Sequence, residues 1–153
     1  MQIDLTGRTA VVTGGASNIG RGISLKLADA GAHVLIVDKD LEQAQRTASL
    51  RPGSISVKEC DLSDLTQVQA LGARLGAEGK ADILVSNAGW VRSVNFIEKD
   101  LGEMDFELRL NLQAPLLLAR LLVPGMAERS WGRIVSVASE AGRAGQRTQV
   151  AYS

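Results

Sequence analysis

The sequence has very few of the residues that build disulfides and metal centres. Among 153 residues there is one cysteine, Cys60, and one histidine, His33. A disulfide needs two cysteines, and a Cys/His metal cluster needs several ligands close together, so neither can form within this chain. We therefore predict no metal site. Cys60 ends an apolar segment and His33 begins one, so both are expected to be structural.

The sequence also lacks an excess of charge of either sign. Lys+Arg and Asp+Glu number 17 each, which gives a formal net charge of zero and no basic field to attract nucleic acid. The longest apolar stretch, residues 110–127, is interrupted by Arg120 and two prolines. The first residues show no basic segment followed by an apolar one. We expect a soluble, cytoplasmic protein with neither a nucleic-acid nor a membrane partner.

Strand-like and helix-like patterns alternate along the whole chain. Apolar segments predict strands at residues 8–13, 33–38, 54–60, 82–86 and 132–138. Segments with helical period predict helices near residues 19–30, 41–50, 64–77 and 103–127. Asp40 with Gln43 is typical of a capping box, and Ser63 is a candidate N-cap. Repeated βα units favour an α/β fold with a doubly wound parallel sheet, the first strand central, in one domain over residues 1–153.

A glycine-rich turn follows the first predicted strand, and a helix-patterned segment begins within it. The turn reads T-G-G-A-S-N-I-G from Thr13 to Gly20. Glycines let main-chain N–H groups approach phosphate oxygens without a Cβ in the way, and a helix N-terminus directs unpaired N–H groups at an anion. Asn18 replaces the usual middle glycine, because asparagine tolerates a left-handed backbone. The turn predicts a pyrophosphate site, and a plain strand-to-helix connection is the alternative. The expected contacts are Gly14, Ser17, Asn18, Ile19 and Gly20.

An acidic residue, Asp38, ends the second predicted strand. Its carboxylate can accept hydrogen bonds from ribose hydroxyls and would repel a 2′-phosphate, which favours NAD over NADP. The neighbouring Lys39 could tolerate that phosphate, so NADP stays open. Further cofactor contacts are expected after the third and fourth strands, where the ligand crevice of such a sheet lies. These residues are Asp61, Leu62, Asn87, Ala88 and Gly89.

Together these motifs resemble the short-chain dehydrogenase/reductase family over the whole chain. The resemblance also includes Asn111 and the pair Ser139 and Tyr152, in the family's order. It implies a Rossmann fold and an NAD(P)-dependent oxidoreductase that interconverts a small secondary alcohol and a ketone. In the family's terms, Tyr152 exchanges a proton with the substrate oxygen, Ser139 hydrogen-bonds that oxygen, and Asn111 supports a proton-relay water.

The family's next active-site residue would fall beyond this sequence. Alcohol oxidation needs a phenolate, and an unperturbed tyrosine with a pKa near 10 is only about 0.1% ionised at neutral pH. In the family, a lysine four residues after the tyrosine helps to lower that pKa, and this chain stops at Ser153. The resemblance therefore implies the N-terminal part of a dehydrogenase, truncated after the fifth strand and inactive alone. A dinucleotide-binding module without turnover, such as a sensor or interaction protein, is the alternative.

Three further features bear on the site and on assembly. Pro115 has no N–H to bond the carbonyl of Asn111, four residues earlier, so that carbonyl could accept from a water where the helix kinks. The leucine-rich fourth helix is apolar on more than one face, and the resemblance implies a homodimer or homotetramer through it. The loop 140–145 resembles members that act on hydroxyacyl and oxoacyl thioesters, and Arg143 could meet a phosphate or carboxylate.

Overall fold

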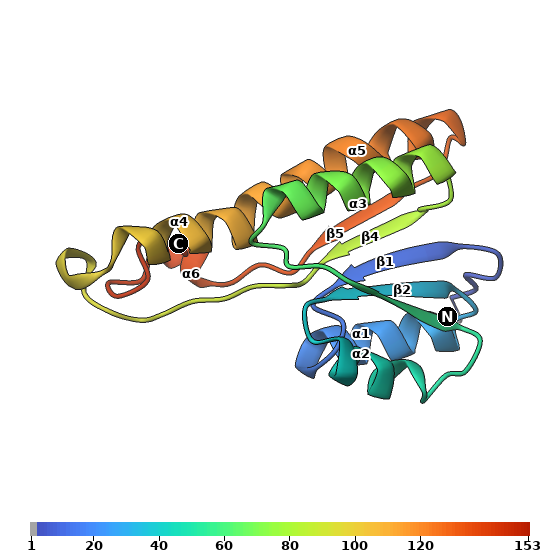
Figure 1. Ribbon diagram of the computed structural model, residues 1–153, viewed down its shortest axis with the longest axis horizontal. Helices are drawn as coiled ribbons and strands as arrows, with labels where there is room; N and C mark the ends of the chain where they lie inside the picture. The colour runs from blue at the N-terminus through green and yellow to red at the C-terminus, as the bar shows by residue number, and fades with distance from the viewer. Residues whose placement is uncertain (1–2) are drawn as a thin grey trace.

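Unbroken apolar runs become the centre of a five-stranded parallel sheet in the computed structural model, which describes residues 3–153 (Figure 1). The strands are β1 (Thr9–Thr13), β2 (His33–Asp38), β3 (Ile55–Glu59), β4 (Ile83–Ser86) and β5 (Arg133–Ser136). Their order is β3-β2-β1-β4-β5, and every neighbouring pair is parallel. The predicted doubly wound fold with a central first strand is confirmed. Burial on both faces explains why β1, β2 and β4 are rich in Val, Ile and Leu.

Two pairs of helices cover the two faces of the sheet (Figure 1). The helices are α1 (Asn18–Asp29), α2 (Leu41–Ala48), α3 (Leu65–Glu78), α4 (Leu101–Leu108), α5 (Ala114–Glu128) and α6 (Ala141–Ala144). Helices α1 and α2 pack on one face, around Val12 and Ile36. Helices α3 and α5 pack on the other, around Val11 and Leu84. The side chains of successive β1 residues therefore belong to different cores, as a strand buried on both sides requires.

The helix starts agree with the capping predictions in one case and not in the other. The Asp40 side chain accepts a hydrogen bond from Gln43 N at 2.9 Å and caps α2 as expected. Ser63 does not cap α3. The cap is Asp64, whose carboxylate accepts from the backbone N–H groups of two first-turn residues. Ser63 instead donates from both its backbone N and its hydroxyl to Asp61.

The single helix predicted over residues 103–127 is a composite of α4, a π-helical turn η2 (Arg109–Gln113) and α5. Its prolines do not divide it into separate helices, and the expectation that they leave this stretch too broken for a membrane span was wrong by length and composition. Residues Leu101–Glu128 form one helical run, the one run within residues 3–153 whose length and composition would suffice to cross a membrane. A core helix passes the same test, and three inner residues of α5, Leu118, Leu122 and Met126, lie in the core shared with α3.

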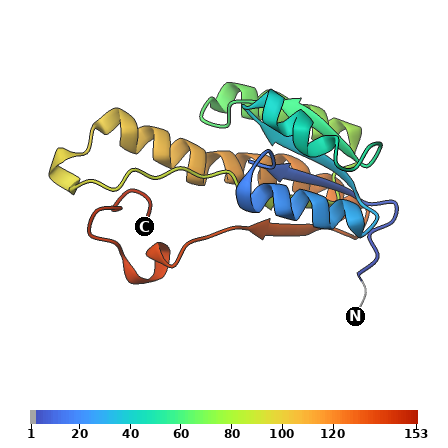
Figure 2. The same ribbon diagram turned by 90° about the horizontal axis from the view of Figure 1, so that it is seen from below.

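Strand β5 forms one edge of the sheet and is exposed along its length. After it, the chain extends away from the sheet to the short helix α6 and then turns back toward the C-terminus (Figure 2). This C-terminal segment lies beside the long connection between β4 and α4, where Val94 N donates to Thr148 O at 3.0 Å. A short 3-10 helix, η1 (Phe96–Glu98), ends that connection. The arrangement brings the end of the chain to the carboxyl side of the sheet.

Candidate functional site

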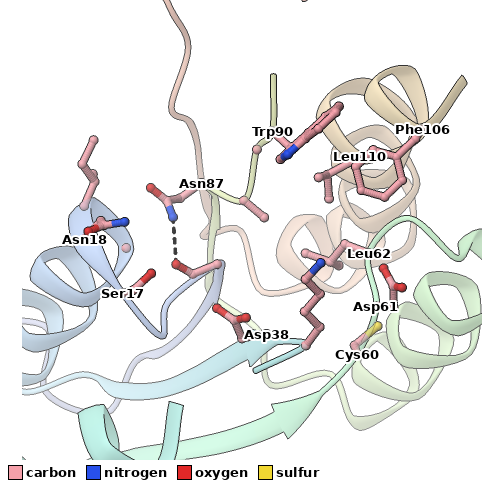
Figure 3. Close-up of a pocket in the computed structure, with 16 residues that line it drawn as sticks. Ser17, Asn18, Asp38, Cys60, Asp61, Leu62, Asn87, Trp90, Phe106 and Leu110 are labelled. Carbon is pink, nitrogen blue, oxygen red and sulfur yellow. Dashed lines mark hydrogen bonds between the residues drawn. The ribbon is translucent and has the colours of Figure 1, made fainter. Parts of the chain in front are cut away.

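A pocket of about 350 Å³ lies at the carboxyl ends of the strands (Figure 3). All eleven predicted dinucleotide contacts line it, namely Gly14, Ser17, Asn18, Ile19, Gly20, Asp38, Asp61, Leu62, Asn87, Ala88 and Gly89. Sequence reasoning did not assign Trp90, Phe106 and Leu110, which face Ser17 and Asn18 across the pocket. Trp90 and Phe106 meet edge to face, with ring centroids 5.2 Å apart. These residues supply an apolar wall opposite a polar one.

The glycine turn has the backbone that its sequence predicts. Asn18 has a φ of 48° and Gly14 a φ of 63°, so asparagine does occupy a left-handed position. The expected reason for a glycine at position 20 was the close approach of a phosphate, and the structure shows a different one. A Cβ at Gly20 would lie 2.0 Å from the carbonyl oxygen of Gly14 and 2.5 Å from Nδ2 of Asn87. The helix can therefore begin against the turn only if residue 20 has no side chain.

Thr13 is a functional position that sequence reasoning missed. Its buried hydroxyl accepts hydrogen bonds from Asn87 N at 3.0 Å and from Ala88 N at 3.1 Å. The Asn87 side chain in turn donates from Nδ2 to the carbonyl oxygens of Thr13 and Gly14, at 3.0 and 3.1 Å. These bonds join the carboxyl ends of β1 and β4 and fix the shape of the turn. The only signal in the sequence was a hydroxyl residue at the end of an apolar strand.

The two acidic residues of the pocket have local partners. Asp38 accepts from Ala16 N through Oδ2 at 3.0 Å and from Asp40 N through Oδ1 at 3.1 Å, so it also braces the glycine turn. Asp61 accepts from the backbone and hydroxyl of Ser63, and these bonds, with help from the positive charge of Lys39, lower the pKa of its carboxyl. Both carboxylates face the pocket as acceptors for hydroxyl or amino donors of a ligand.

Cys60 lines the same pocket but is 2% exposed. Burial raises the pKa of its thiol, and the nearby carboxylates of Asp61 and Asp64 raise it further. The thiol therefore stays protonated at neutral pH and contributes an apolar surface, in line with the structural role expected from the sequence. No cluster of His, Cys, Asp or Glu within residues 3–153 is arranged to hold a metal ion.

A second cavity, of about 720 Å³, adjoins the first and is lined by the three predicted catalytic residues, Asn111, Ser139 and Tyr152. The two cavities share a wall, which consists of Ile19, Asn87, Ala88, Gly89 and Trp90. The fold thus brings together residues from η2, from the end of β5 and from the C-terminal segment. It places them next to the pocket that holds the dinucleotide motifs.

Asn111 is held by the connection after β4. Its Oδ1 accepts from Trp90 N at 2.9 Å and its Nδ2 donates to Trp90 O at 2.8 Å. The amide thus anchors Trp90, and the main-chain carbonyl of Asn111 is a further acceptor that it can offer to a water. Pro115, which also lines the cavity, has no N–H to donate to that carbonyl. The helix adopts its π-helical turn over the five residues just before Ala114 and Pro115, the place where a kink was expected.

Ser139 and Tyr152 reach the cavity from irregular segments. Ser139 Oγ accepts from Ala141 N at 3.2 Å, which begins α6 and leaves the hydroxyl hydrogen available for another acceptor. Tyr152 follows a turn in which its backbone N donates to Gln149 O at 3.0 Å. Both side chains are partly buried. An acceptor oxygen in this cavity could therefore meet two hydroxyl donors.

The lining of the first pocket suits a dinucleotide in its chemistry. The N-terminus of α1 and the glycine turn offer unpaired main-chain N–H groups, while Asp38 offers carboxylate oxygens at the end of β2. Trp90 and Leu110 supply apolar surface for a flat ring. Fold and site together define the class: an α/β protein with a dinucleotide site at the switch point of its sheet, beside a cavity with a serine and a tyrosine.

Comparison with known proteins gives the family. The family model of the short chain dehydrogenase matches residues 8–153, so the chain belongs to the short-chain dehydrogenase/reductase family of NAD(P)-dependent oxidoreductases. It is 36% identical over 152 residues to the D-threitol dehydrogenase of Mycolicibacterium smegmatis, covering 97% of this chain and 58% of that protein. It is 34% identical over 153 residues to the D-beta-hydroxybutyrate dehydrogenase of Cupriavidus necator, covering 97% and 59%.

A solved structure agrees with the fold. It is a Beutenbergia cavernae protein, provisionally named an NAD(P)-dependent gluconate 5-dehydrogenase, with NADP bound at low occupancy. It superposes with a TM-score of 0.91 at 37% identity, covering 99% of this chain and 62% of that one. The chain thus spans well under two thirds of the length of each of these relatives.

Proposed function

We propose that this chain supplies the dinucleotide site and the proton-exchanging tyrosine of an NAD-dependent oxidoreductase that interconverts a secondary alcohol and a ketone. The observation that carries the proposal is the wall shared by the two cavities. Residues 87–90 separate the pocket of the dinucleotide motifs from the cavity of Asn111, Ser139 and Tyr152. A substrate oxygen near Tyr152 would therefore lie within reach of a ring held in the first pocket.

The residues of the second cavity have complementary tasks in this proposal. A bound nicotinamide would supply or accept the hydride. The Tyr152 phenol donates a proton to the substrate oxygen in reduction, and the Ser139 hydroxyl holds that oxygen by a hydrogen bond. In oxidation the Tyr152 side chain accepts the proton of the substrate hydroxyl. The Asn111 carbonyl accepts from a water that carries the proton onward.

The preference for NAD rests on Asp38. Its carboxylate stands at the end of β2 and would repel a 2′-phosphate, although the Beutenbergia cavernae relative holds NADP. Lys39 lines the same pocket and is the residue that would favour NADP if Asp38 does not dominate. The choice between NAD and NADP therefore depends on which of these adjacent side chains, Asp38 or Lys39, has the larger effect on a 2′-phosphate.

Substrate, assembly and location complete the proposal. The two named relatives act on a sugar alcohol and on a hydroxy acid, so a small secondary alcohol is favoured. A hydroxyacyl or oxoacyl thioester is the narrower suggestion, supported by Arg143 next to Gly142, which lines the second cavity.

Exposed leucines on η2 and α5 support a homodimer or homotetramer through this helix. The expected location is the cytoplasm.

The test is made on the whole protein that contains this chain, with Tyr152→Phe and Ser139→Ala variants. We expect both to bind NADH as the wild type does and to lose turnover of secondary alcohols by about 100-fold or more, because a general acid typically contributes 10²–10⁴-fold. Residues 1–153 alone should bind with little turnover. Dinucleotide binding without turnover in the whole wild-type protein would instead support a non-catalytic sensor or interaction module.

A further inference from the structure

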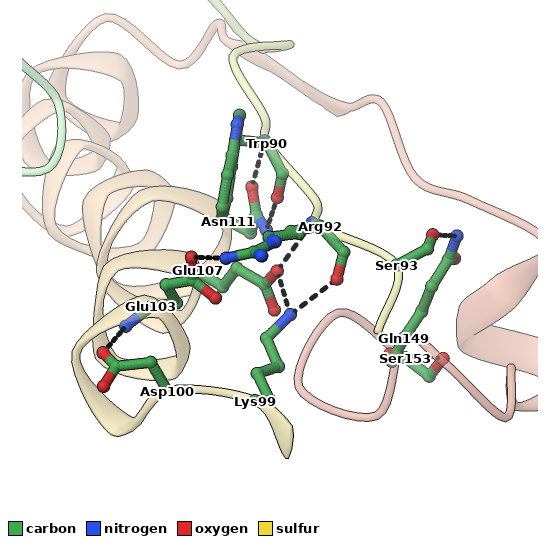
Figure 4. A network of polar contacts seen from close by, with 10 residues as sticks. All are labelled: Trp90, Arg92, Ser93, Lys99, Asp100, Glu103, Glu107, Asn111, Gln149 and Ser153. Atoms are coloured by element: carbon green, nitrogen blue, oxygen red, sulfur yellow. Dashed lines mark hydrogen bonds and ion pairs between the residues drawn. The ribbon is translucent and has the colours of Figure 1, made fainter. Parts of the chain in front are cut away.

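Asn111 and Glu107 lie on one face of the α4–η2 run, and both form hydrogen bonds with the main chain of the connection after β4 (Figure 4). Asn111 binds both the N–H and the carbonyl of Trp90. One turn earlier, Glu107 Oε1 accepts from Arg92 N at 3.0 Å, and Lys99 Nζ donates to Arg92 O at 2.9 Å. Lys99 and Glu107 also form an ion pair with each other. The pair thus does for residue 92 what the Asn111 amide does for residue 90.

This ion pair is buried, with the Lys99 and Glu107 side chains 1% and 0% exposed. Oε2 of Glu107 is buried as well and has no hydrogen-bond partner among residues 3–153. Removing two charges from water is costly, and replacing such a pair by apolar residues is often neutral or stabilising. Stability alone therefore does not account for a lysine and a glutamate at these positions.

The connection held by these contacts is itself hydrogen-bonded to the segment that contains Tyr152. Beyond Arg92, Ser93 Oγ accepts from Gln149 Nε2 at 2.8 Å and Val94 N donates to Thr148 O. Gln149 O then accepts from Tyr152 N. In the other direction along the chain, Trp90 stands in the wall between the two cavities. A displacement of residue 92 would therefore change the position of that wall and of the segment that contains Tyr152.

We propose that Lys99 and Glu107 are positioning residues, which hold residues 90–94 so that Tyr152 stands correctly against the shared wall. The inference rests on the proposed function for its catalytic consequence. Its structural content, that the ion pair orders both residues 90–94 and residues 146–152, is independent of that function. Asn111 fixes this segment at residue 90, and the ion pair fixes it at residue 92.

The test uses the whole protein and two charge-free double variants. Lys99→Met/Glu107→Leu removes both bonds to Arg92, while Lys99→Met/Glu107→Gln keeps an oxygen that can accept from Arg92 N. Asp105→Asn is the matched control, because it breaks an exposed ion pair to Arg109 on the same helix. Thermal unfolding, hydrogen exchange of peptides covering residues 88–96 and 146–153, and kcat and KM are measured on each.

We expect Lys99→Met/Glu107→Leu to keep a wild-type unfolding midpoint but to exchange faster in both peptides and not in β1 or β2. Its kcat should fall by about 10–100-fold with little change in KM for the dinucleotide, the scale expected when a reacting group is displaced by about 1 Å. The glutamine variant should recover part of both losses, and Asp105→Asn should match the wild type.

Unchanged exchange and unchanged kcat in a folded Lys99→Met/Glu107→Leu protein would overturn the proposal. If that variant does not fold, hydrogen exchange of the wild type still tests the proposal. An Arg92 amide that exchanges as fast as one without a hydrogen bond would contradict the contact with Glu107. A wild type without dinucleotide binding or turnover would refute the proposed function instead. The exchange comparison would then still show whether the ion pair orders the Tyr152 segment.

Discussion

Gly20 and Gly22 lie two residues apart in α1 and have opposite surroundings. A Cβ at Gly20 would collide with the carbonyl of Gly14, whereas a Cβ at Gly22 would meet nothing within 4 Å. The requirement for glycine within α1 is therefore specific to position 20. It concerns the contact between the turn and its own helix more than it concerns a ligand.

Gly20→Ala is expected to lower the free energy of unfolding by about 1–3 kcal/mol, the cost of overpacking, and to lose most NADH affinity. Gly22→Ala should bind normally and gain up to about 1 kcal/mol, because alanine is the better helix former. Denaturant unfolding and NADH fluorescence titration of the whole protein measure both quantities. Equal NADH affinity in the two variants would remove the phosphate site from this turn.

Asp38 has two separable roles, since it braces Ala16 N and places charge at the ribose position. Asp38→Ala should lose about 1.5–3 kcal/mol of NAD binding, the range for hydrogen bonds to a charged group, and gain relative affinity for NADP. Asp38→Asn keeps an oxygen for Ala16 N, so it isolates the effect of charge. Titrations with both dinucleotides test this. A wild type that prefers NADP would assign the choice to Lys39.

At the scale of elements, the α4–η2–α5 run adapts to its two prolines in different ways. Pro115 is the second residue after the π-helical turn and lines the second cavity, whereas Pro124 lies inside α5 and lines neither cavity. A π-helical turn within a helix often marks a functional site. The irregularity is thus confined to the proline beside Asn111.

Pro115→Ala restores an N–H that can bond the carbonyl of Asn111, so we expect a more regular helix and slower alcohol turnover. Stability should hold or rise, by no more than about 3 kcal/mol, the helix-interior penalty of proline. Pro124→Ala is the control, which should share any gain in stability without losing turnover. Circular dichroism, thermal unfolding and kcat measure the outcome. Full activity in Pro115→Ala would separate the π-helical turn from the reaction.

The main helices and strands and the central place of the first strand could be predicted from the sequence, because continuous apolar runs alternate with segments of helical period and right-handed crossovers limit the topology. The local exceptions could not. Asp64 and Ser63 are both good caps, and only the bonds of Ser63 to Asp61 decide between them. Trp90 and Phe106 resemble ordinary core residues until the fold sets them against the glycine turn. Lys99 and Glu107 are eight residues apart in a charged segment that predicts solvent exposure.

At the scale of the molecule, one group of exposed large apolar side chains lies on neighbouring elements at the β5 end of the sheet. They belong to η2 and α5, with Leu112 and Leu116, and to β5, with Ile134 and Val135. The outer edge of β5 also has no neighbouring strand among residues 3–153. Edges and patches of this kind favour association with another surface.

Leu116→Glu is expected to reduce self-association of the protein, because it places a charge in the most exposed apolar position of α5, at 61% exposure. Leu50→Glu is the control, since Leu50 is 42% exposed and follows α2, the helix that packs on the face of the sheet opposite to α5. Light scattering over a concentration series measures the assembly. If both substitutions dissociate the protein equally, the α5 face is not the interface.

The bonds between Thr13 and Asn87 join residues 74 positions apart. Contacts of such long sequence separation form slowly, because the intervening chain must be ordered first. The glycine turn is complete only once β1 and β4 have paired, so a dinucleotide would bind the fully folded chain and not its precursors. At a hundredfold excess over Kd, that selectivity adds about 2.7 kcal/mol to the folded state. The supply of coenzyme in a cell would then help to set how much of this protein survives proteolysis, quite apart from any reaction it takes part in.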